Sequence, residues 1–112
     1  PYTTLFRSNT ARKKMTAKQL KEYLKNVEPF QQDGRWGLRV MNDIIVNPIY
    51  SYISDFRGDY AECRIGIQKC LYGLLDRRGN IILPPEYKYI YGWNEHAVEV
   101  KGNDGYSRTI EL

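Results

Sequence analysis

The chain has 112 residues, of which 42% are hydrophobic and 13% aromatic, including ten tyrosines. This length fits a single domain with a modest core, and no apolar run is long enough to span a membrane. The net charge of +4 comes entirely from four basic residues before position 15, because from Met15 onward 13 basic residues match 13 acidic ones. Nucleic acid is therefore not an expected partner, since the rest of the chain has no net charge to attract a polyanion.

The first residues are set apart from the rest of the chain. The octapeptide Pro1–Ser8 is similar to the in-frame translation of a short-read sequencing adapter, and the earliest methionine is Met15. We interpret residues 1–14 as an artefactual or disordered leader of a gene predicted on a metagenomic contig, and we leave them out of the fold. The protein then starts at Met15 or upstream of this sequence, and we expect it to be cytoplasmic unless an N-terminal signal has been lost.

Residues 15–29 are predicted to form an N-terminal helix. Thr16-Ala17-Lys18-Gln19 has the pattern of a capping box. Apolar residues then follow at helical spacing, namely Leu20, Tyr23, Leu24 and Val27. Pro29 is expected to end the helix at or just before Glu28. Because a helix of about three turns is marginal alone, its apolar side should cover the start of the following domain. Docking to a separate partner is the alternative.

Residues 34–112 contain one pattern twice, followed by a partial third copy. Trp36-Gly37-Leu38 opens the first copy and Tyr72-Gly73-Leu74 opens the second. The copies span about residues 34–70 and 71–104, and the partial copy at 105–112 is expected to begin with Gly105-Tyr106-Ser107. The signature positions are Trp36, Gly37, Pro48, Tyr50, Ile53, Phe56, Tyr72, Gly73, Gly79, Pro85, Tyr87, Ile90 and Trp93. A period of this size is typical of repeat architectures.

Each copy is predicted to consist of short strands joined by turns. In the second copy, the segment 76–80 should turn the chain, with a positive φ at Gly79. Ile81–Leu83 returns as the partner strand, and Pro84-Pro85 is expected to end it because proline cannot donate to the ladder. In the first copy, Asn42 is expected to take the left-handed conformation instead of a glycine.

These elements predict a mainly β fold of antiparallel β-hairpin repeats with an N-terminal capping helix, all in one domain. The strands could form one curved sheet, a small barrel or a solenoid segment, and the sequence does not choose among them. The pattern resembles the WG β-hairpin repeat family of bacterial proteins over about residues 34–108. The resemblance rests on Trp/Tyr-Gly-Leu, Asp-x-x-Gly-Asn, Ile-Ile, Pro-Pro-x-Tyr and Tyr-x-x-Ile-x-x-Phe/Trp. It implies a non-enzymatic binding or structural module without a defined ligand, and Tyr72 and Tyr106 depart from the Trp that the family favours.

The sequence has no constellation typical of an enzyme, a metal site or a cofactor site. His96 is the only histidine, so it does not indicate a zinc site, and no motif links it to a nucleophile. Glu62 and Glu99 occupy the same place in both copies, which favours the solvent side of a half-buried strand over a catalytic pair. Cys63 takes an apolar place in the repeat and is expected to be buried rather than bridged to Cys70.

Aromatic side chains are the most plausible functional surface, and ordinary packing is the alternative. Tyr87, Tyr89 and Trp93 have aromatic counterparts in the first copy, which favours a place in the repeated core. Tyr87, Tyr89 and Tyr91 alternate, which would place them on one face of a single strand, where rings can stack on sugars or peptides. Tyr91 is the strongest candidate, because Ser54 stands at its place in the first copy and residues specific to one copy suit a specific contact. The candidate binding surface consists of Tyr91, His96 and Lys88.

The expected function is therefore a non-enzymatic binding or scaffold module. It would contact a protein or a glycan through one face of the repeats, with no cofactor. The alternative is a structural fragment of a longer repeat protein with no independent activity, because two copies are fewer than such arrays usually need.

Overall fold

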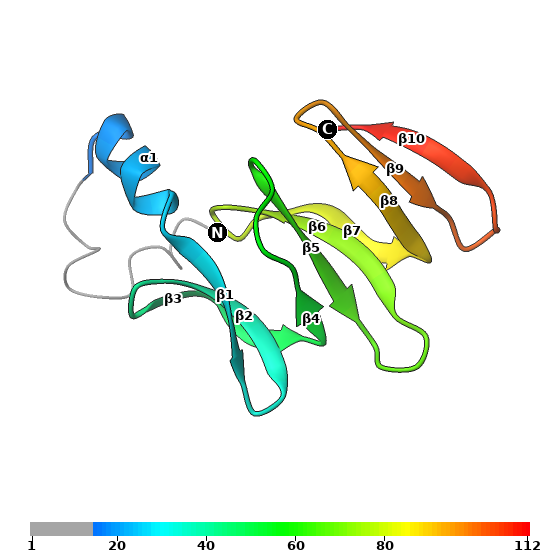
Figure 1. Ribbon diagram of the computed structural model, residues 1–112, viewed down its shortest axis with the longest axis horizontal. Helices are drawn as coiled ribbons and strands as arrows, with labels where there is room; N and C mark the ends of the chain where they lie inside the picture. The colour runs from blue at the N-terminus through cyan, green and yellow to red at the C-terminus, as the bar shows by residue number, and fades with distance from the viewer. Residues whose placement is uncertain (1–14) are drawn as a thin grey trace.

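The computed structural model describes residues 15–112, which form one helix and ten strands (Figure 1). The elements are α1 (Ala17–Leu24), β1 (Val27–Gln32), β2 (Arg35–Val40), β3 (Asp43–Tyr50), β4 (Tyr52–Ile53), β5 (Tyr60–Ile65), β6 (Leu71–Asp76), β7 (Ile81–Tyr87), β8 (Tyr89–Trp93), β9 (Ala97–Lys101) and β10 (Ser107–Glu111). The predicted mainly β fold with an N-terminal helix is confirmed. The predicted leader, residues 1–14, lies outside the described residues.

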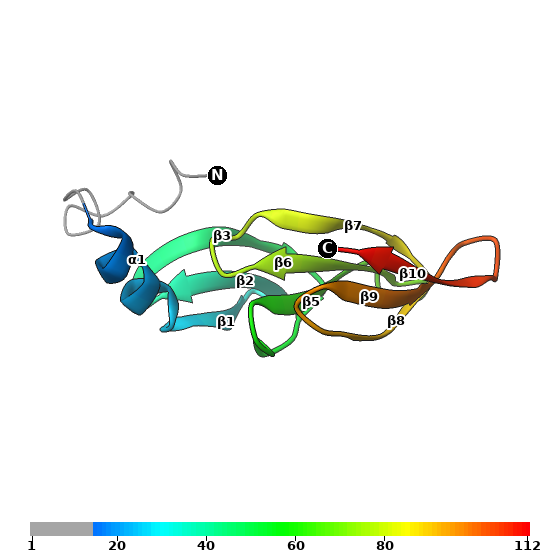
Figure 2. The same cartoon turned by 90° about the horizontal axis from the view of Figure 1, so that it is seen from above.

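The strands form three antiparallel sheets that follow one another in chain order. The first sheet is β1-β2-β3, the second is β4-β5-β6-β7 and the third is β8-β9-β10. Figures 1 and 2 both show α1 at one end of the molecule and the third sheet at the other. Neighbouring sheets pack through their faces, so the arrangement is a short stack rather than one curved sheet or a closed barrel.

Two hydrophobic cores hold the stack together, one on each side of the second sheet. The core between the first and second sheets contains Leu38, Val40, Ile45, Tyr50, Ile53, Ala61, Cys63 and Leu75. The core between the second and third sheets contains Leu74, Leu83, Ile90, Val98 and Val100. Leu74 and Leu75 are neighbours on β6 and point into different cores, because successive side chains of a strand alternate between its faces. The second sheet is thus covered on both sides.

Helix α1 covers the start of the first core, as the sequence predicts. The Thr16 hydroxyl accepts a hydrogen bond from the Gln19 backbone N–H at 3.1 Å, and the Gln19 side chain accepts one from the Thr16 N–H at 3.0 Å. Leu24 is buried, while Leu20 and Tyr23 are partly buried beside it. The Tyr23 hydroxyl donates to Asp43 Oδ2 at 3.0 Å. Burial, reinforced by this hydrogen bond, raises the pKa of Tyr23 to about 12.

The prediction that the helix extends to residue 29 is wrong. It ends at Leu24, and Val27 begins strand β1, which places Pro29 on the edge of the first sheet, where a missing N–H costs least. Asp33 and Gly34 then connect β1 to β2 with φ values of 53° and 78°. Positive φ at both residues is the signature of a type I′ hairpin turn, so β1 and β2 form a hairpin that the helix prediction excluded.

The turns that close the hairpins agree with the prediction in the second copy only. Gly79 has a φ of 83°, and the Asp76 carboxylate accepts hydrogen bonds from the backbone N–H groups of Arg78 and Asn80 at 2.9 and 2.8 Å. In the first copy the left-handed residue is Met41, with a φ of 54°. The assignment of that conformation to Asn42 is therefore wrong by one residue.

The two repeats share a bulge in the strand that pairs with the glycine of each Trp/Tyr-Gly pair. In the first sheet Trp36 pairs with Tyr50 and Leu38 with Val46, so Gly37 alone faces three residues of β3. The second sheet repeats this at Gly73, because Tyr72 pairs with Tyr87 and Leu74 with Leu83. The prediction that Pro84-Pro85 ends the strand is wrong, since β7 continues through these prolines. They lie in the bulge of an edge strand, where no ladder donor is needed.

The bulge brings backbone atoms of the neighbouring strand to the place that a Cβ atom on Gly37 or Gly73 would occupy. A Cβ on Gly73 would lie 2.4 Å from the Leu83 carbonyl oxygen, and one on Gly37 would lie 2.3 Å from that of Val46. Only glycine fits at these two positions.

We expect Gly73→Ala to lower the free energy of unfolding by about 2–3 kcal/mol, because the added methyl overlaps backbone that cannot move without breaking the bulge. Gly92→Ala is the matched control, since a Cβ there has no atom within 4 Å, and it should change stability by less than about 0.5 kcal/mol. Urea unfolding of both variants measures the difference. Equal stability of the two variants would contradict the bulge as the structural constraint.

The two cysteines occupy different environments. Cys63 is fully buried in the core between the first and second sheets, as predicted, and burial raises its pKa to about 12. Cys70 is partly exposed, and its thiol donates to the Gly66 carbonyl oxygen at 3.0 Å. Both thiols are free, so no disulfide joins them.

Candidate functional site

The third sheet turns one face toward the second sheet and the other face away from it. Val98 and Val100 on β9 lie in the core shared with the second sheet, so the residues that alternate with them point away. Thr109 on β10 stands opposite Glu99 and shares its face. We call this outward surface the terminal face; it consists of Ala97, Glu99, Lys101, Ser107, Thr109 and Glu111, with Tyr89 and Tyr91 from β8.

Strand register shows where the third sheet departs from the second. In the second sheet, Arg64 and Cys63 on β5 pair with Tyr72 and Gly73 on β6. In the third sheet, the corresponding residues Lys101 and Val100 on β9 pair with Ser107 and Arg108 on β10. The expectation that Tyr106-Ser107 repeats the Trp/Tyr-Gly pair is therefore wrong by one position. Tyr106 is instead a turn residue that is 72% exposed. Arg108 stands where a bulged strand requires glycine.

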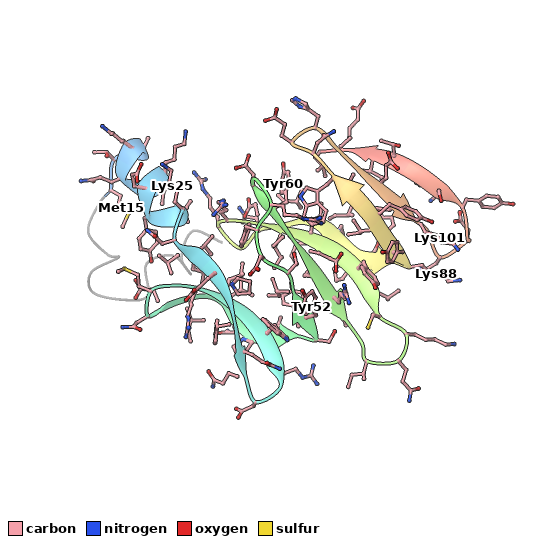
Figure 3. The ribbon with its side chains drawn as sticks, in the orientation of Figure 1. Met15, Lys25, Tyr52, Tyr60, Lys88 and Lys101 are labelled. Atoms are coloured by element: carbon pink, nitrogen blue, oxygen red, sulfur yellow. The ribbon has the colours of Figure 1, made fainter. Side chains whose placement is uncertain are left out.

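The terminal face carries small or polar residues at the places where the second sheet carries large apolar ones. The corresponding pairs are Tyr60 and Ala97, Tyr72 and Ser107, and Leu74 and Thr109. The second-sheet members of these pairs pack in or against the core shared with the third sheet, and Figure 3 shows Tyr60 between the two sheets. A further sheet stacked in the same register would meet hydroxyl groups and a methyl group there instead of large apolar side chains.

An open groove of about 480 Å³ lies on the terminal face. Its lining includes Tyr91, Trp93, Asn94, Glu99 and Thr109. Tyr91 is 53% exposed, and its hydroxyl accepts a hydrogen bond from Ser107 Oγ at 3.3 Å. Trp93 is held in place, since its Nε1 donates to the Arg57 carbonyl oxygen at 3.2 Å and the Arg57 guanidinium lies 3.9 Å from the ring centroid.

Several polar groups in this groove keep unused hydrogen-bonding capacity. Asn94 Oδ1 accepts from the backbone N–H groups of His96 and Ala97 at 2.8 and 2.9 Å, which fixes the amide and leaves Nδ2 able to donate. The side chains of Glu99 and Thr109 have no partner among residues 15–112. The groove thus offers a donor, a carboxylate and a hydroxyl beside an exposed ring.

The equivalent groups in the second sheet satisfy one another instead. Arg64 Nε donates to Glu62 Oε2 at 2.6 Å, and the guanidinium lies 4.6 and 4.7 Å from the ring centroids of Tyr52 and Tyr72. Glu62 is only 8% exposed, so its prediction as a solvent-side residue is wrong, whereas Glu99 is exposed as predicted. The difference arises because the third sheet covers Glu62, whereas no described residue covers Glu99 in the same way.

The structure separates the three residues predicted as a binding surface. Tyr91 lies within β8, Lys88 directly before this strand and His96 in the turn after it, so Lys88 and His96 stand at opposite ends of β8. Lys88 lies beside Lys101 (Figure 3), and its backbone N–H donates to the Lys101 carbonyl oxygen at 2.8 Å. His96 is exposed and contacts Glu95 at 3.5 Å. Only Tyr91 lines the groove.

The predicted row of three tyrosines on one strand is also wrong. Tyr87 ends β7 in the second sheet, whereas Tyr89 begins β8 in the third sheet. Tyr89 and Tyr91 do share a side, since their ring centroids are 5.2 Å apart. The break falls at Lys88, where the chain passes from one sheet to the next.

Sequence reasoning missed Asn94 and Thr109 and assigned no binding role to Glu99. Asn94 is recognisable only as a capping residue of the β8–β9 turn. Thr109 would have stood out as a polar replacement for Leu74, but only in the register that the structure reveals. A one-residue misalignment of the third copy concealed it.

A larger cleft than this groove lies elsewhere, between α1 and the turns of the second sheet. It has a volume of about 680 Å³ and is lined by Leu20, Leu24, Lys25, Gly58, Asp59 and Arg77. Arg77 crosses it, donating to the carbonyl oxygens of Leu24 and Gly58 at 3.2 and 2.9 Å. These bonds tie the helix to the second sheet, which gives the cleft walls a structural role.

Neither a metal-ligand cluster nor a membrane-spanning helix is present in residues 15–112. No group of three or more His, Cys, Asp or Glu side chains there could hold a metal ion. Helix α1, the only helix in this part of the chain, is too short to cross a membrane.

We expect Arg64→Met to lower the free energy of unfolding by about 2 kcal/mol, because it leaves the buried Glu62 carboxylate without its partner. The partial exposure of Arg64 should keep the loss below that of a fully buried pair. Glu62→Gln combined with Arg64→Met should recover part of the stability. Arg39→Met is the control, since its ion pair with Glu28 is exposed and is worth less than about 1 kcal/mol. Urea unfolding would refute this account if the Arg64 and Arg39 variants lost the same stability.

Comparison with known protein families supports the prediction that the chain consists of repeats. The family model of the WG containing repeat matches residues 41–66 and 72–105, which together make up more than half of the chain. The first match covers β3 to β5 and the second covers most of β6 through β9. Searches of curated proteins and of solved structures found no match. Two adjacent matches that follow the observed strands show that the chain belongs to the family of WG-containing-repeat proteins.

Proposed function

We propose that the chain is a non-enzymatic binding module whose ligand contacts the terminal face of the third sheet. The observation that carries this proposal is the contrast between two equivalent faces. Where the second sheet packs Tyr60, Tyr72 and Leu74 against its neighbour, the third sheet presents small and polar residues around an open groove. A surface built to receive another sheet would keep the apolar residues.

The composition of the groove supports binding rather than chemistry. Glu99 is the only carboxylate in its lining, and neither a histidine nor a cysteine accompanies it. General acid–base chemistry on a bond commonly needs two positioned groups, such as a carboxylate pair. Ligand pockets of this kind combine an aromatic surface with a few polar groups that fix orientation, which is the composition seen here.

The remaining repeat residues serve as the scaffold for this face. The bulge at Gly73 and the Glu62–Arg64 pair hold the second sheet, on which the third sheet rests through Val98 and Val100. Binding groups set on strands of a rigid stack keep their positions better than groups on loops.

We expect amide chemical shift changes confined to β8, β9, β10 and the turn between β8 and β9 when the ¹⁵N-labelled full chain is titrated with a panel of short neutral oligosaccharides, acidic oligosaccharides and extended peptides. At least one member of the panel should bind, with a dissociation constant in the millimolar range, because the groove offers few contacts. The expected shifts centre on Tyr91, Glu99 and Thr109. The exposed turn residue Tyr106 serves as the internal control and should not move.

Two outcomes would contradict the proposal. Shifts centred on the cleft under α1, near Leu20 and Arg77, would move the binding surface to the other end of the stack. No shift with any member of the panel would favour the alternative of a purely structural repeat segment.

A further inference from the structure

We propose that the groove on the terminal face binds a neutral oligosaccharide, with the Tyr91 ring as the stacking surface. This inference rests on the proposed function and specifies the ligand class. Sugar rings present an apolar face of C–H groups bordered by hydroxyls, so they fit sites that combine an aromatic ring with nearby donors and acceptors. Tyr91 supplies the exposed ring, and the groove surrounds it with side-chain polar groups.

The hydrogen-bonding groups match a polyhydroxylated ligand. Asn94 Nδ2 can donate, Glu99 can accept, and Thr109 can do both. The Asn94 amide is oriented by two backbone bonds to its oxygen, so its donor is fixed before a ligand arrives. Hydroxyl groups can act as either donor or acceptor, which allows one ligand to satisfy all three side chains.

The charge of the terminal face argues against an acidic ligand. Glu99 and Glu111 carry negative charge there, and Lys101 carries the one positive charge among the residues of this face. A face with this balance repels a polyanion rather than attracting it. Uronic acid polymers, nucleic acids and acidic peptides are therefore disfavoured relative to an uncharged sugar.

The same face lacks the features of a protein interface. Binding hot spots need large apolar or aromatic anchors that become fully buried, and the terminal face offers only the neighbouring rings of Tyr91 and Tyr89 as exposed large hydrophobic side chains. The exposed isoleucines lie on other elements, at Ile49 on β3, Ile65 on β5, Ile67 after it, and Ile81 and Ile82 on β7. A groove of about 480 Å³ falls within the usual range of ~300–1,000 Å³ for small-ligand sites, which suits a short oligosaccharide.

The test compares four variants of the full chain in titrations with cellotetraose, xylotetraose and N-acetylchitotetraose, followed by ¹⁵N amide shifts. At least one sugar should bind at the terminal face of the parent chain. Tyr91→Ala should weaken that binding by about tenfold or more, whereas Tyr91→Phe, which keeps the ring, should stay within about threefold. Thr109→Leu, which restores the apolar residue of the second sheet, should abolish binding by filling the groove. Tyr106→Ala should bind like the parent chain.

Folding of each variant is checked by the unchanged amide spectrum outside β8 to β10, since Tyr91 and Thr109 are both exposed. If a peptide shifts the terminal-face amides and no neutral sugar does, the oligosaccharide inference is wrong while the proposed binding module stands. If a sugar binds there but Tyr91→Ala binds it equally well, the stacking role is wrong. If no probe shifts the terminal face, both proposals fail.

Discussion

The close approach of a bulged strand to a glycine is the constraint on which the rest of the structure depends. At Gly37 and Gly73 a carbonyl oxygen of the neighbouring strand lies 2.3 and 2.4 Å from where a Cβ would be, so no other residue fits. The bulge bends the outer strand, and a single residue then leads into the next sheet, Ser51 after the first bulge and Lys88 after the second. Each Trp/Tyr-Gly pair thereby sets the step from one sheet to the next, and the aromatic residue packs across that step, as the 5.4 Å contact of Trp36 with Tyr52 shows.

The third sheet differs from the second in the chemistry of its outward face. Arg108 occupies the position of the glycine, so a bulged strand cannot pack against β10 as it does against β6. The face beyond it carries Ser107 and Thr109 where the second sheet has Tyr72 and Leu74. Among residues 15–112 no sheet packs on this face. The proposed binding groove lies on it, which links the repeat geometry to the function.

The sequence predicts much of the repeated structure, because the same backbone constraint requires the same residue types at the same places in both copies. The hairpins, the positive φ of Gly79 and the burial of Cys63 all follow from turn chemistry or from comparing copies. Strand β1 was missed because Pro29 suggests a helix end, although Asp33-Gly34 carries the stronger hairpin signal. The groove could not be predicted, because Asn94, Glu99 and Thr109 come together only through the register of β10, and that register has no repeat motif to mark it.

The most direct test of this account is hydrogen–deuterium exchange along the full chain. If the second sheet is covered on both faces and the terminal face of the third is bare, amides of β6 should exchange slowest and those of β10 much faster. Slow exchange is expected near Leu74, which points into the core shared with the third sheet, and near Leu75, which points into the core shared with the first. Protection of Ser107–Glu111 equal to that of β6 would contradict the account, because it would mean that another sheet or a second copy of the chain covers the terminal face.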